Sequence, residues 1–274
     1  MATDAARITS VRNPAVKLVR SLARASERRT EGAYLAEGVR LITEAIASGQ
    51  RARLVLFDPE SLARSEAGRR IAAALAGWAE RAFPATSDVL AAAAQTVTPG
   101  GIVAVLSMPD PGQLGSHRRD SLGVILDGVA DPGNAGTILR SADAFGVGWV
   151  ACAPGSVDLF SPKVVRAGMG AHFRLPVYQA VEWEDLAAAL PETALIGTDA
   201  AAGAPLSTFR WPASSALVIG SEARGLSSEA QAHLAGRVRI PMRTGVESLN
   251  ASVAASIVMY EASRASLPPD PNRD

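Results

Sequence analysis

Apolar residues in the first half of the chain follow two kinds of spacing. Over residues 11–22 they recur every three or four positions, which predicts a helix with one apolar face, and a similar pattern predicts a second helix over residues 38–48. A basic, glycine-containing turn is expected between these helices, over residues 24–32. Short apolar runs at residues 54–57 and 102–106 predict buried strands. Together these elements describe a small α/β domain.

The second half of the chain alternates apolar runs with helix-forming segments. Runs that are apolar at consecutive positions predict strands covered on both faces, and helices between such strands favour a parallel sheet. We therefore predict an α/β fold in this half, a parallel sheet with helices on both faces. The predicted strands are residues 122–126, 149–153, 194–197, 216–220 and 238–240.

A polar, turn-rich segment separates the two halves. Prolines and glycines interrupt every periodic pattern between residues 108 and 120, which indicates a linker. We therefore expect a first domain over residues 1–107 and a second domain over residues 121–265. The proline-containing end of the chain, residues 266–274, is expected to be a disordered tail.

Composition narrows the class of protein. The 274 residues are 48% hydrophobic and 20% charged, and 27 basic side chains balance 27 acidic ones, which excludes an intrinsically disordered chain. A single cysteine, Cys152, and three widely spaced histidines, His117, His172 and His233, show no metal-ligand spacing, so we expect no metal site. The sequence begins without an apolar signal-peptide core, and no apolar run is long enough for a membrane helix. We expect a soluble, cytoplasmic protein that does not enter a membrane.

Basic residues gather in the first domain. Residues 1–53 contain ten basic and five acidic side chains, and ten minus five leaves a net charge of +5 on this segment of a neutral chain. Only Lys17 and Lys163 are lysines, so almost every cation is a planar guanidinium, which suits phosphate. A genome rich in arginine codons explains the choice of residue equally well, but not its concentration at one end. The pattern therefore indicates a nucleic-acid partner.

Two glycine-containing segments match nucleotide-binding patterns by letters alone. Residues 146–151, GVGWVA, would open a strand, whereas the dinucleotide fingerprint must open a helix, so Gly146 is better explained as the end of a helix. Residues 220–225, GSEARG, have the glycine spacing of a phosphate-binding loop but lack the lysine that follows it. A dinucleotide-dependent oxidoreductase therefore ranks last of three hypotheses for the function.

Two further segments lie where a predicted strand turns into a helix. In residues 127–146, Pro132 and Gly133 form the turn and Asn134 is placed to cap the helix. Arg140 lies off the apolar face of that helix. It is either a functional residue or an ordinary solvent-exposed arginine. In residues 217–227, glycines at a strand end let backbone approach a ligand, although they serve an ordinary turn equally well.

The last such segment, residues 240–264, leads from a strand through a polar loop into a helix. Pro241 ends the strand, and Ser248 and Asn250 are natural helix caps that need no function by themselves. Small residues at the start of the helix would let other backbone approach it unusually closely: Ala251, Ser252, Ala254, Ala255 and Ser256.

Together and in this order, the three segments resemble the motifs of the SpoU (TrmH-type) branch of the SPOUT RNA methyltransferases. The first motif resembles residues 134–140, the second residues 220–225, and the third residues 240–242 with residues 248–250. Ser221 departs from the asparagine that many members carry, although other members have serine there. The N-terminal segment 34–38 with Arg40 resembles the family's substrate-binding domain, a fold similar to the ribosomal protein L30e.

The resemblance implies a fold, a cofactor and an assembly. Members of the family have a C-terminal segment threaded into a trefoil knot, bind S-adenosylmethionine among the loops of the knot, and are active as homodimers. Carried over by position, the cofactor-binding residues are Thr198, Asp199, Gly220, Ser221, Glu222, Gly225, Ile240, Pro241, Met242, Ser248, Leu249, Asn250 and Ser252.

The resemblance also implies a chemistry. It assigns Arg140 to activating a ribose 2′-hydroxyl, but a guanidinium is a poor base, so we expect Arg140 to grip the adjacent phosphate and stabilise negative charge on the oxygen. The remaining catalytic residues would orient the ribose and the cofactor, with Glu222 a candidate proton acceptor: Asn134, Glu222, Ser248 and Asn250. Contacts to RNA phosphates are expected from Arg24, Arg28, Arg29 and Arg40.

The leading hypothesis is a dimeric, metal-independent RNA 2′-O-ribose methyltransferase that uses S-adenosylmethionine. Its expected substrate is 23S ribosomal RNA, in preference to tRNA, because of the L30e-like extension. The second hypothesis is a non-catalytic RNA-binding module that kept the fold.

Overall fold

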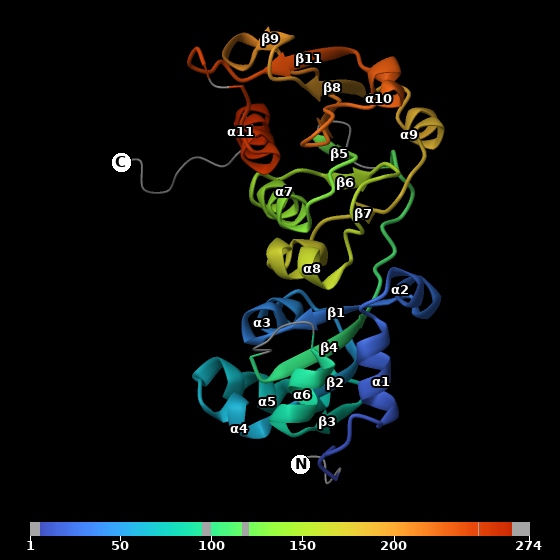
Figure 1. Ribbon diagram of the computed structural model, residues 1–274, viewed down its shortest axis with the longest axis vertical. Coiled ribbons are helices and arrows are strands. Elements are labelled where there is room, and N and C mark those ends of the chain that lie inside the picture. Colours follow the sequence, from blue (N-terminus) through green and yellow to red (C-terminus); the bar gives the residue numbers. More distant parts are fainter. Residues whose placement is uncertain (1–5, 95–99, 117–120, 246, 265–274) are drawn as a thin grey trace. The chain divides into compact units, whose positions relative to one another are not determined.

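The chain folds into two compact units. The computed structural model describes residues 6–94, 100–116, 121–245 and 247–264 (Figure 1). One unit comprises Met1–Pro109 with Phe160–Arg174, and the other comprises Asp110–Leu159 with Leu175–Asp274. The expected tail, residues 266–274, and the end of the expected linker, residues 117–120, lie outside the described residues.

The segment Phe160–Arg174 groups with the first unit, although the sequence placed it in the second domain. Its helix α8 (Pro162–Gly168) packs on strand β1 (Ala33–Glu37). The ring of Phe160 meets the buried ring of Tyr34 edge-on, with 5.2 Å between their centroids. Apolar burial between residues distant in sequence therefore decides where this segment belongs.

The first unit is built on a four-stranded sheet with the order β1-β4-β2-β3. Strand β4 pairs antiparallel with both β1 and β2, whereas β2 and β3 are parallel. Buried side chains of helix α1 and of the strands form a core, Val16, Val19, Leu54 and Leu56 among them. The elements of this unit are α1 (Pro14–Ser21), α2 (Ala25–Glu31), β1 (Ala33–Glu37), α3 (Val39–Ala47), β2 (Ala52–Phe57), α4 (Pro59–Ala63), α5 (Glu66–Trp78), β3 (Ala82–Pro84), α6 (Ser87–Ala93), β4 (Ile102–Ser107), α8 (Pro162–Gly168) and the 3-10 helix η1 (Ala171–Phe173).

Both predicted helices and both predicted strands of this unit are present, with corrections between them. Helix α1 begins at Pro14 because the side chain of Asn13 accepts a hydrogen bond from the Ala15 amide at 2.9 Å. Residues 25–31, expected to form a turn, are helix α2, which ends where Gly32 adopts a φ of 54°. Strand β1 was not predicted, since its short, mixed sequence shows no alternation and its pairing with β4 decides its conformation.

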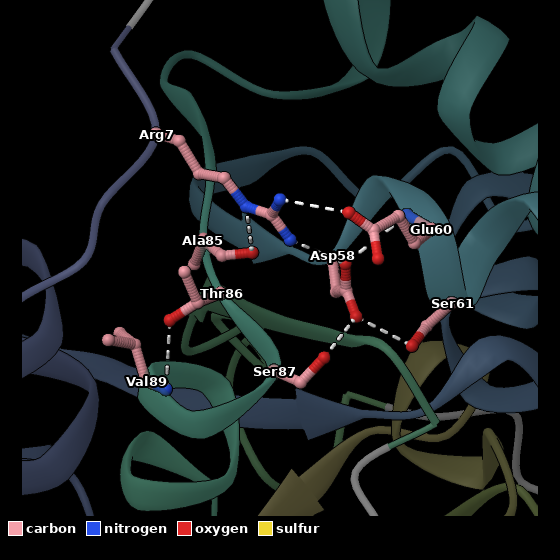
Figure 2. Close-up of polar contacts among 8 residues, drawn as sticks. All are labelled: Arg7, Asp58, Glu60, Ser61, Ala85, Thr86, Ser87 and Val89. Atoms are coloured by element: carbon pink, nitrogen blue, oxygen red, sulfur yellow. Dashed lines mark hydrogen bonds and ion pairs between the residues drawn. The ribbon is translucent and has the colours of Figure 1, made fainter.

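A buried carboxylate joins three parts of the first unit (Figure 2). Asp58, 1% exposed, follows β2 and caps α4, and it accepts hydrogen bonds from the hydroxyls of Ser61 and Ser87, each at 2.7 Å. Arg7 reaches the same carboxylate at 3.2 Å. Burial by itself raises the pKa of Asp58, but the hydrogen bonds from Ser87, Ser61 and the Glu60 amide, with the charge of Arg7, outweigh it, so the pKa lies below its usual value.

The second unit contains a seven-stranded sheet with the order β7-β6-β5-β10-β8-β11-β9, in which every pair is parallel. This confirms the predicted parallel sheet. Helices α7 and α11 lie on one face and α9 and α10 on the other (Figure 1). The elements are β5 (Gly123–Asp127), α7 (Pro132–Ala144), β6 (Trp149–Cys152), β7 (Val177–Tyr178), α9 (Trp183–Ala189), β8 (Ala194–Thr198), β9 (Ala204–Pro205), the 3-10 helix η2 (Leu206–Thr208), β10 (Ser215–Gly220), α10 (Ser228–His233), β11 (Gly236–Arg239) and α11 (Ala251–Ser263).

The predicted strands of the second unit occur within two residues of their expected bounds. Strands β7 and β9, with two residues each, were not predicted because they are too short to show a pattern. Gly146, which follows the C-cap residue Phe145 of α7, has a φ of 70°, as expected of a glycine that ends a helix.

Parallel strands bring their carboxyl ends to one edge of the sheet. Strands β5, β10, β8 and β11 are consecutive neighbours, so the segments that follow them meet at this edge. Helices α7 and α11 pack together, and the hydroxyls of Ser141 and Ser256 lie 2.7 Å apart between them. The small residues of α11 permit this close contact.

The described residues supply two further findings about the chain. None of their helices is both long enough and apolar enough to cross a membrane. They also contain no cluster of three or more His, Cys, Asp or Glu side chains that could hold a metal ion.

Candidate functional site

The carboxyl edge of the second unit contains a cavity of about 440 Å³. Its walls come from the ends of β8, β10 and β11 and from the start of α11. Pro241 and Ser252 are not part of its described lining, although both were expected to bind the cofactor. The other residues expected to bind the cofactor all line it: Thr198, Asp199, Gly220, Ser221, Glu222, Gly225, Ile240, Met242, Ser248, Leu249 and Asn250.

A tight turn after β10 forms one wall of the cavity. The backbones of Ser221 and Gly225 exchange two hydrogen bonds, at 2.9 and 2.8 Å, and Gly225 has a φ of 68°. A Cβ atom on Gly220 would lie 2.4 Å from the carbonyl carbon of Gly225. Any residue other than glycine at position 220 would push the backbone of Gly225 away. The shape of this wall therefore depends on Gly220.

Asn134 joins the first expected motif to the other two. Its side-chain amide donates to a Glu222 carboxylate oxygen at 2.7 Å, and its side-chain oxygen accepts from the amide of Asn250 at 3.0 Å. The sequence predicted that Asn134 caps α7, and this is wrong: Asp131 is the cap, accepting from the Asn134 backbone amide at 2.7 Å. Because Asp131 takes this role, the Asn134 side chain is available to bridge the motifs.

Asn250 caps helix α11, as its position in the sequence suggested. Its side-chain oxygen accepts hydrogen bonds from the backbone amides of Ser252, at 2.9 Å, and Val253, at 3.2 Å, and from the Ser252 hydroxyl at 2.7 Å. These three donors fix the orientation of the side-chain amide, whose NH₂ group therefore points to Asn134. Ser252 thus acts on the site through Asn250.

Asp199 organises the loop that follows β8. One carboxylate oxygen accepts from the backbone amides of Ala201 and Ala202, both at 2.9 Å, and the other from Arg237 at 3.1 Å. The amides of Ala202 and Ala201, opposed by burial and helped by the charge of Arg237, hold the pKa of Asp199 below its usual value. The carboxylate is therefore charged at neutral pH and largely committed to its own loop.

The structure does not bring Arg140 into the cavity. Ile138, Leu139 and Ala142 form the buried face of α7, and Arg140 is exposed on another side of this helix. Its side chain forms no hydrogen bond or ion pair with any described residue. Its guanidinium is accordingly free to contact a ligand outside the cavity.

The expected RNA-binding arginines divide into two kinds. Arg24, Arg29 and Arg40 are exposed. Arg28 is only 2% exposed and donates hydrogen bonds to the carbonyl oxygens of Leu22 and Ala23, both at 2.8 Å. The structure thus contradicts the expected RNA contact of Arg28, because its guanidinium serves to satisfy the carbonyl groups after α1.

Sequence reasoning missed two carboxylates near the site. Asp131, before Pro132, caps α7, and an Asp-Pro pair at a predicted helix start is a signal that could have found it. Asp127, at the end of β5, is buried and accepts from the backbone amide and the hydroxyl of Ser227, at 2.6 and 2.9 Å. A single aspartate at a strand end gives no such signal, since its partner lies 100 positions away.

Models of protein families match both halves of the chain. Residues 121–260 match the SpoU rRNA Methylase family. Residues 13–104 match the MRM3-like substrate binding domain. The first match contains all the residues that line the cavity.

Relatives of nearly the same length support these matches. An uncharacterized tRNA/rRNA methyltransferase of Synechocystis is 34% identical over 96% of each chain. The 23S rRNA (guanosine(2553)-2′-O)-methyltransferase of Bacillus subtilis is 30% identical over 93% of this chain and 98% of that protein. The solved structure of the SpoU methyltransferase AviRb from Streptomyces viridochromogenes, in complex with AdoMet, has a TM-score of 0.82 at 30% identity, and the match covers 93% of this chain and 98% of that one.

Proposed function

Because the chain belongs to the SpoU rRNA methylase family, we propose that it transfers a methyl group from S-adenosylmethionine to a ribose 2′-hydroxyl of ribosomal RNA. One observation carries this proposal: the loops of three neighbouring strands meet at a cavity, and Asn134 bridges Glu222 and Asn250 beside it. The RNA named for the Bacillus subtilis relative, 23S rRNA, favours the same substrate here.

The cavity suits S-adenosylmethionine in size and in the chemistry of its walls. Its volume of about 440 Å³ falls within the roughly 300–1,000 Å³ typical of small-molecule sites. Ile219, Val238 and Val258 offer apolar surface to an adenine ring, and Thr198 and Ser248 offer hydroxyls to its polar parts. The backbone groups of the lining glycines and of Ile240 and Leu249 would hold the adenine and methionine parts.

When bound, S-adenosylmethionine would supply a methyl group on a positively charged sulfur: the ribose oxygen would bond to the methyl carbon as the carbon–sulfur bond breaks, and the sulfur would keep that electron pair as a neutral thioether. The protein's largest contribution is to hold the two reactants in line, which is worth ~7–11 kcal/mol of the barrier. The bridge through Asn134 fixes Glu222 at the rim of the cavity, and we assign to Glu222 the proton that leaves the hydroxyl. Ser248 and Asn250 orient the ribose and the cofactor.

Arg140 acts on the RNA from outside the cavity in this proposal. A guanidinium stays protonated at neutral pH and therefore cannot serve as a base. Arg140 is exposed on α7 and has no partner among the described residues, so it is available to bind the phosphate beside the target ribose. The same positive charge would stabilise negative charge on the reacting oxygen.

We also propose a homodimer, a knotted C-terminal segment and a cytoplasmic location. Four large apolar residues of α11 and the loop before it, spaced four, four and three positions apart, are 36–48% exposed and form an apolar stripe suited to a second copy of the chain: Leu249, Val253, Ile257 and Tyr260. The small residues at the start of α11 suit the close threading that a trefoil knot requires. The likeness to a bacterial 23S rRNA methyltransferase supports a cytoplasmic location.

The first unit would bring RNA to the site. The match of residues 13–104 to a substrate-binding domain supports an RNA-binding domain over residues 1–107. A linker over residues 108–120 and a methyltransferase domain over residues 121–265 would follow, with residues 160–174 packed in the first unit. Arg24, Arg29 and Arg40 would attract phosphates without regard to sequence.

The proposal is tested by mapping 2′-O-methyl groups in RNA from cells with and without the gene, using nuclease digestion and mass spectrometry. One position in ribosomal RNA should lose its methyl group, and the purified protein should restore it with S-adenosylmethionine. Loss of a methyl group from tRNA alone would replace rRNA by tRNA as the substrate. Unchanged RNA together with no binding of S-adenosylmethionine would indicate a non-catalytic RNA-binding protein.

A further inference from the structure

A second cavity adjoins the cofactor cavity across the turn of residues 221–225. Its volume is about 290 Å³, and Ser221 and Gly225 line both cavities. Within the turn, Glu222 lines the cofactor cavity, whereas Arg224 lines the second one. A single turn therefore separates two cavities and presents side chains of opposite charge to them.

The acidic groups of the second cavity have hydrogen-bond partners, whereas its guanidinium has none among the described residues. Asp127 accepts two hydrogen bonds from Ser227, at 2.6 and 2.9 Å. Glu229 accepts one from the Ser228 hydroxyl at 3.0 Å. Arg224 is exposed and forms no hydrogen bond or ion pair with the part of the chain that the structure describes. Arg224 is therefore the group of this cavity that is available to bind an anion.

The other walls of the second cavity leave room for a flat ring. Gly128, Pro154 and Gly155 contribute no long side chain, so backbone and the proline ring form this part of the surface. A volume of about 290 Å³ lies at the lower limit of roughly 300 Å³ for ligand sites, which suits a single base better than a whole nucleotide.

We infer that the second cavity binds the base of the nucleotide that is methylated, and that Arg224 binds a phosphate of the same nucleotide. The inference rests on the proposed function. The base is attached to the ribose carbon next to the one that carries the 2′-hydroxyl. A ribose lying over the turn, with its hydroxyl toward the cofactor cavity, therefore directs its base toward the second cavity.

This arrangement requires the target base to be unpaired. A base held in the cavity cannot stack within a helix, and enzymes that act on one nucleotide of a duplex turn it out of the stack at a cost of a few kcal/mol. Single-stranded loops expose their bases without that cost. The target nucleotide is accordingly expected in a loop or bulge of the RNA.

Two substitutions separate the two parts of the inference. Arg224→Ala removes the guanidinium, and Ser228→Phe places a ring in the cavity from an exposed position at the start of α10. The matched control is Arg210→Ala, an exposed arginine of the same unit that lines neither cavity. The assay measures methyl transfer to ribosomal RNA from cells that lack the gene, together with the Kd of S-adenosylmethionine by calorimetry.

Arg224→Ala should raise the KM for RNA about 10-fold and reduce the salt dependence of RNA binding by about one unit of slope. Ser228→Phe should raise the same KM about 10-fold with no change in the slope, because it blocks the base and removes no charge. Both variants should bind S-adenosylmethionine as the control does, which also shows that they fold.

An RNA fragment that lacks the base at the methylated position tests the cavity itself. The unaltered protein should lose about as much activity on this RNA as Ser228→Phe loses on the complete RNA. Ser228→Phe should not distinguish the two RNAs, because its cavity can receive no base. A further, equal loss for Ser228→Phe on the RNA without the base would overturn the inference.

The inference and the proposed function fail in different ways. If the unaltered protein methylates no RNA, the proposed function is wrong. If it methylates ribosomal RNA and both variants match Arg210→Ala in their KM values, the function stands and the second cavity has no part in binding the target nucleotide.

Discussion

The side-chain amide of Asn134 donates a hydrogen bond to the Glu222 carboxylate at 2.7 Å, across 88 positions of sequence. The contact exists because β5 and β10, which precede these residues, are neighbours in the sheet. It holds a carboxylate at the rim of the proposed cofactor cavity and connects it through Asn134 to the cap of α11. The site is therefore one hydrogen-bonded unit drawn from three segments of the chain.

Asn134→Ala is expected to lower kcat about 10- to 100-fold, since hydrogen bonds to charged groups are worth about 1.5–3 kcal/mol. Glu222 and Asn250 would both lose their partner, while the cofactor cavity keeps its lining. Asn13→Ala is the control, because Asn13 caps α1 in the first unit. It should lower the melting temperature without changing kcat. Steady-state kinetics and thermal unfolding check both variants, and an unchanged kcat for Asn134→Ala would remove this bridge from the mechanism.

Arg140→Ala is expected to keep the Kd of S-adenosylmethionine and to lose most methyl transfer. Arg140 does not line the cavity, so its removal leaves cofactor binding intact, whereas its proposed contact is with the RNA phosphate. Calorimetry measures the first quantity and methylation of ribosomal RNA the second. Arg140→Lys should recover part of the activity because it restores the charge but not the forked geometry. Near-normal turnover of Arg140→Ala contradicts the role assigned to it.

Gly220→Ala is expected to weaken cofactor binding and to destabilise the protein by about 1–3 kcal/mol. The new Cβ would meet the carbonyl carbon of Gly225 at 2.4 Å, and backbone cannot yield as a flexible side chain can. Gly77→Ala provides the comparison, since nothing lies within 4 Å of a Cβ at this helical position. That change should be neutral or stabilising by about 0.5–1 kcal/mol. Calorimetry with S-adenosylmethionine and urea unfolding measure the two effects.

Asp58 and the groups that bind its carboxylate, Ser61, Ser87 and Arg7, are expected to make the first unit sensitive to acid. The pKa of Asp58 is lower in the folded protein than the roughly 3.9 of an unfolded chain, so its contribution to stability is present above that value and is lost as pH falls through the folded pKa. Asp58→Asn should therefore be less stable than the unaltered protein at pH 7, with a difference that shrinks below about pH 4. Urea unfolding at several pH values measures this difference. Asp88→Asn, at an exposed carboxylate of the same unit, should show a much smaller effect.

Ile257→Asp is expected to convert the proposed homodimer to a monomer. Ile257 lies in the middle of the exposed apolar stripe of α11, where a buried, unpaired carboxylate would oppose association. Val11→Asp, which changes an equally exposed apolar residue of the first unit, should leave the assembly intact. Sedimentation equilibrium distinguishes the two states. A dimer that survives Ile257→Asp contradicts the use of this stripe.

Local patterns in the sequence were enough to predict most of the second unit. Consecutive apolar runs such as residues 216–220 predicted β10, because a strand covered on both faces needs apolar residues at every position. The glycines and polar residues after these strands predicted which loops would meet, because parallel strands share one carboxyl edge. The expected capping role of Asn134 was wrong, however, since Asp131 caps α7.

The sequence by itself determined the elements and the residue types at the ends of the strands, because these depend on the conformational preferences of neighbouring residues. Tertiary structure alone decided that Asn134 joins Glu222, that Arg28 is buried against the end of α1, and that Phe160 packs on Tyr34. Each of these contacts depends on how elements pack after they have formed. The free energy of such packing comes from burial and hydrogen bonds between segments whose separation along the chain carries no local signal.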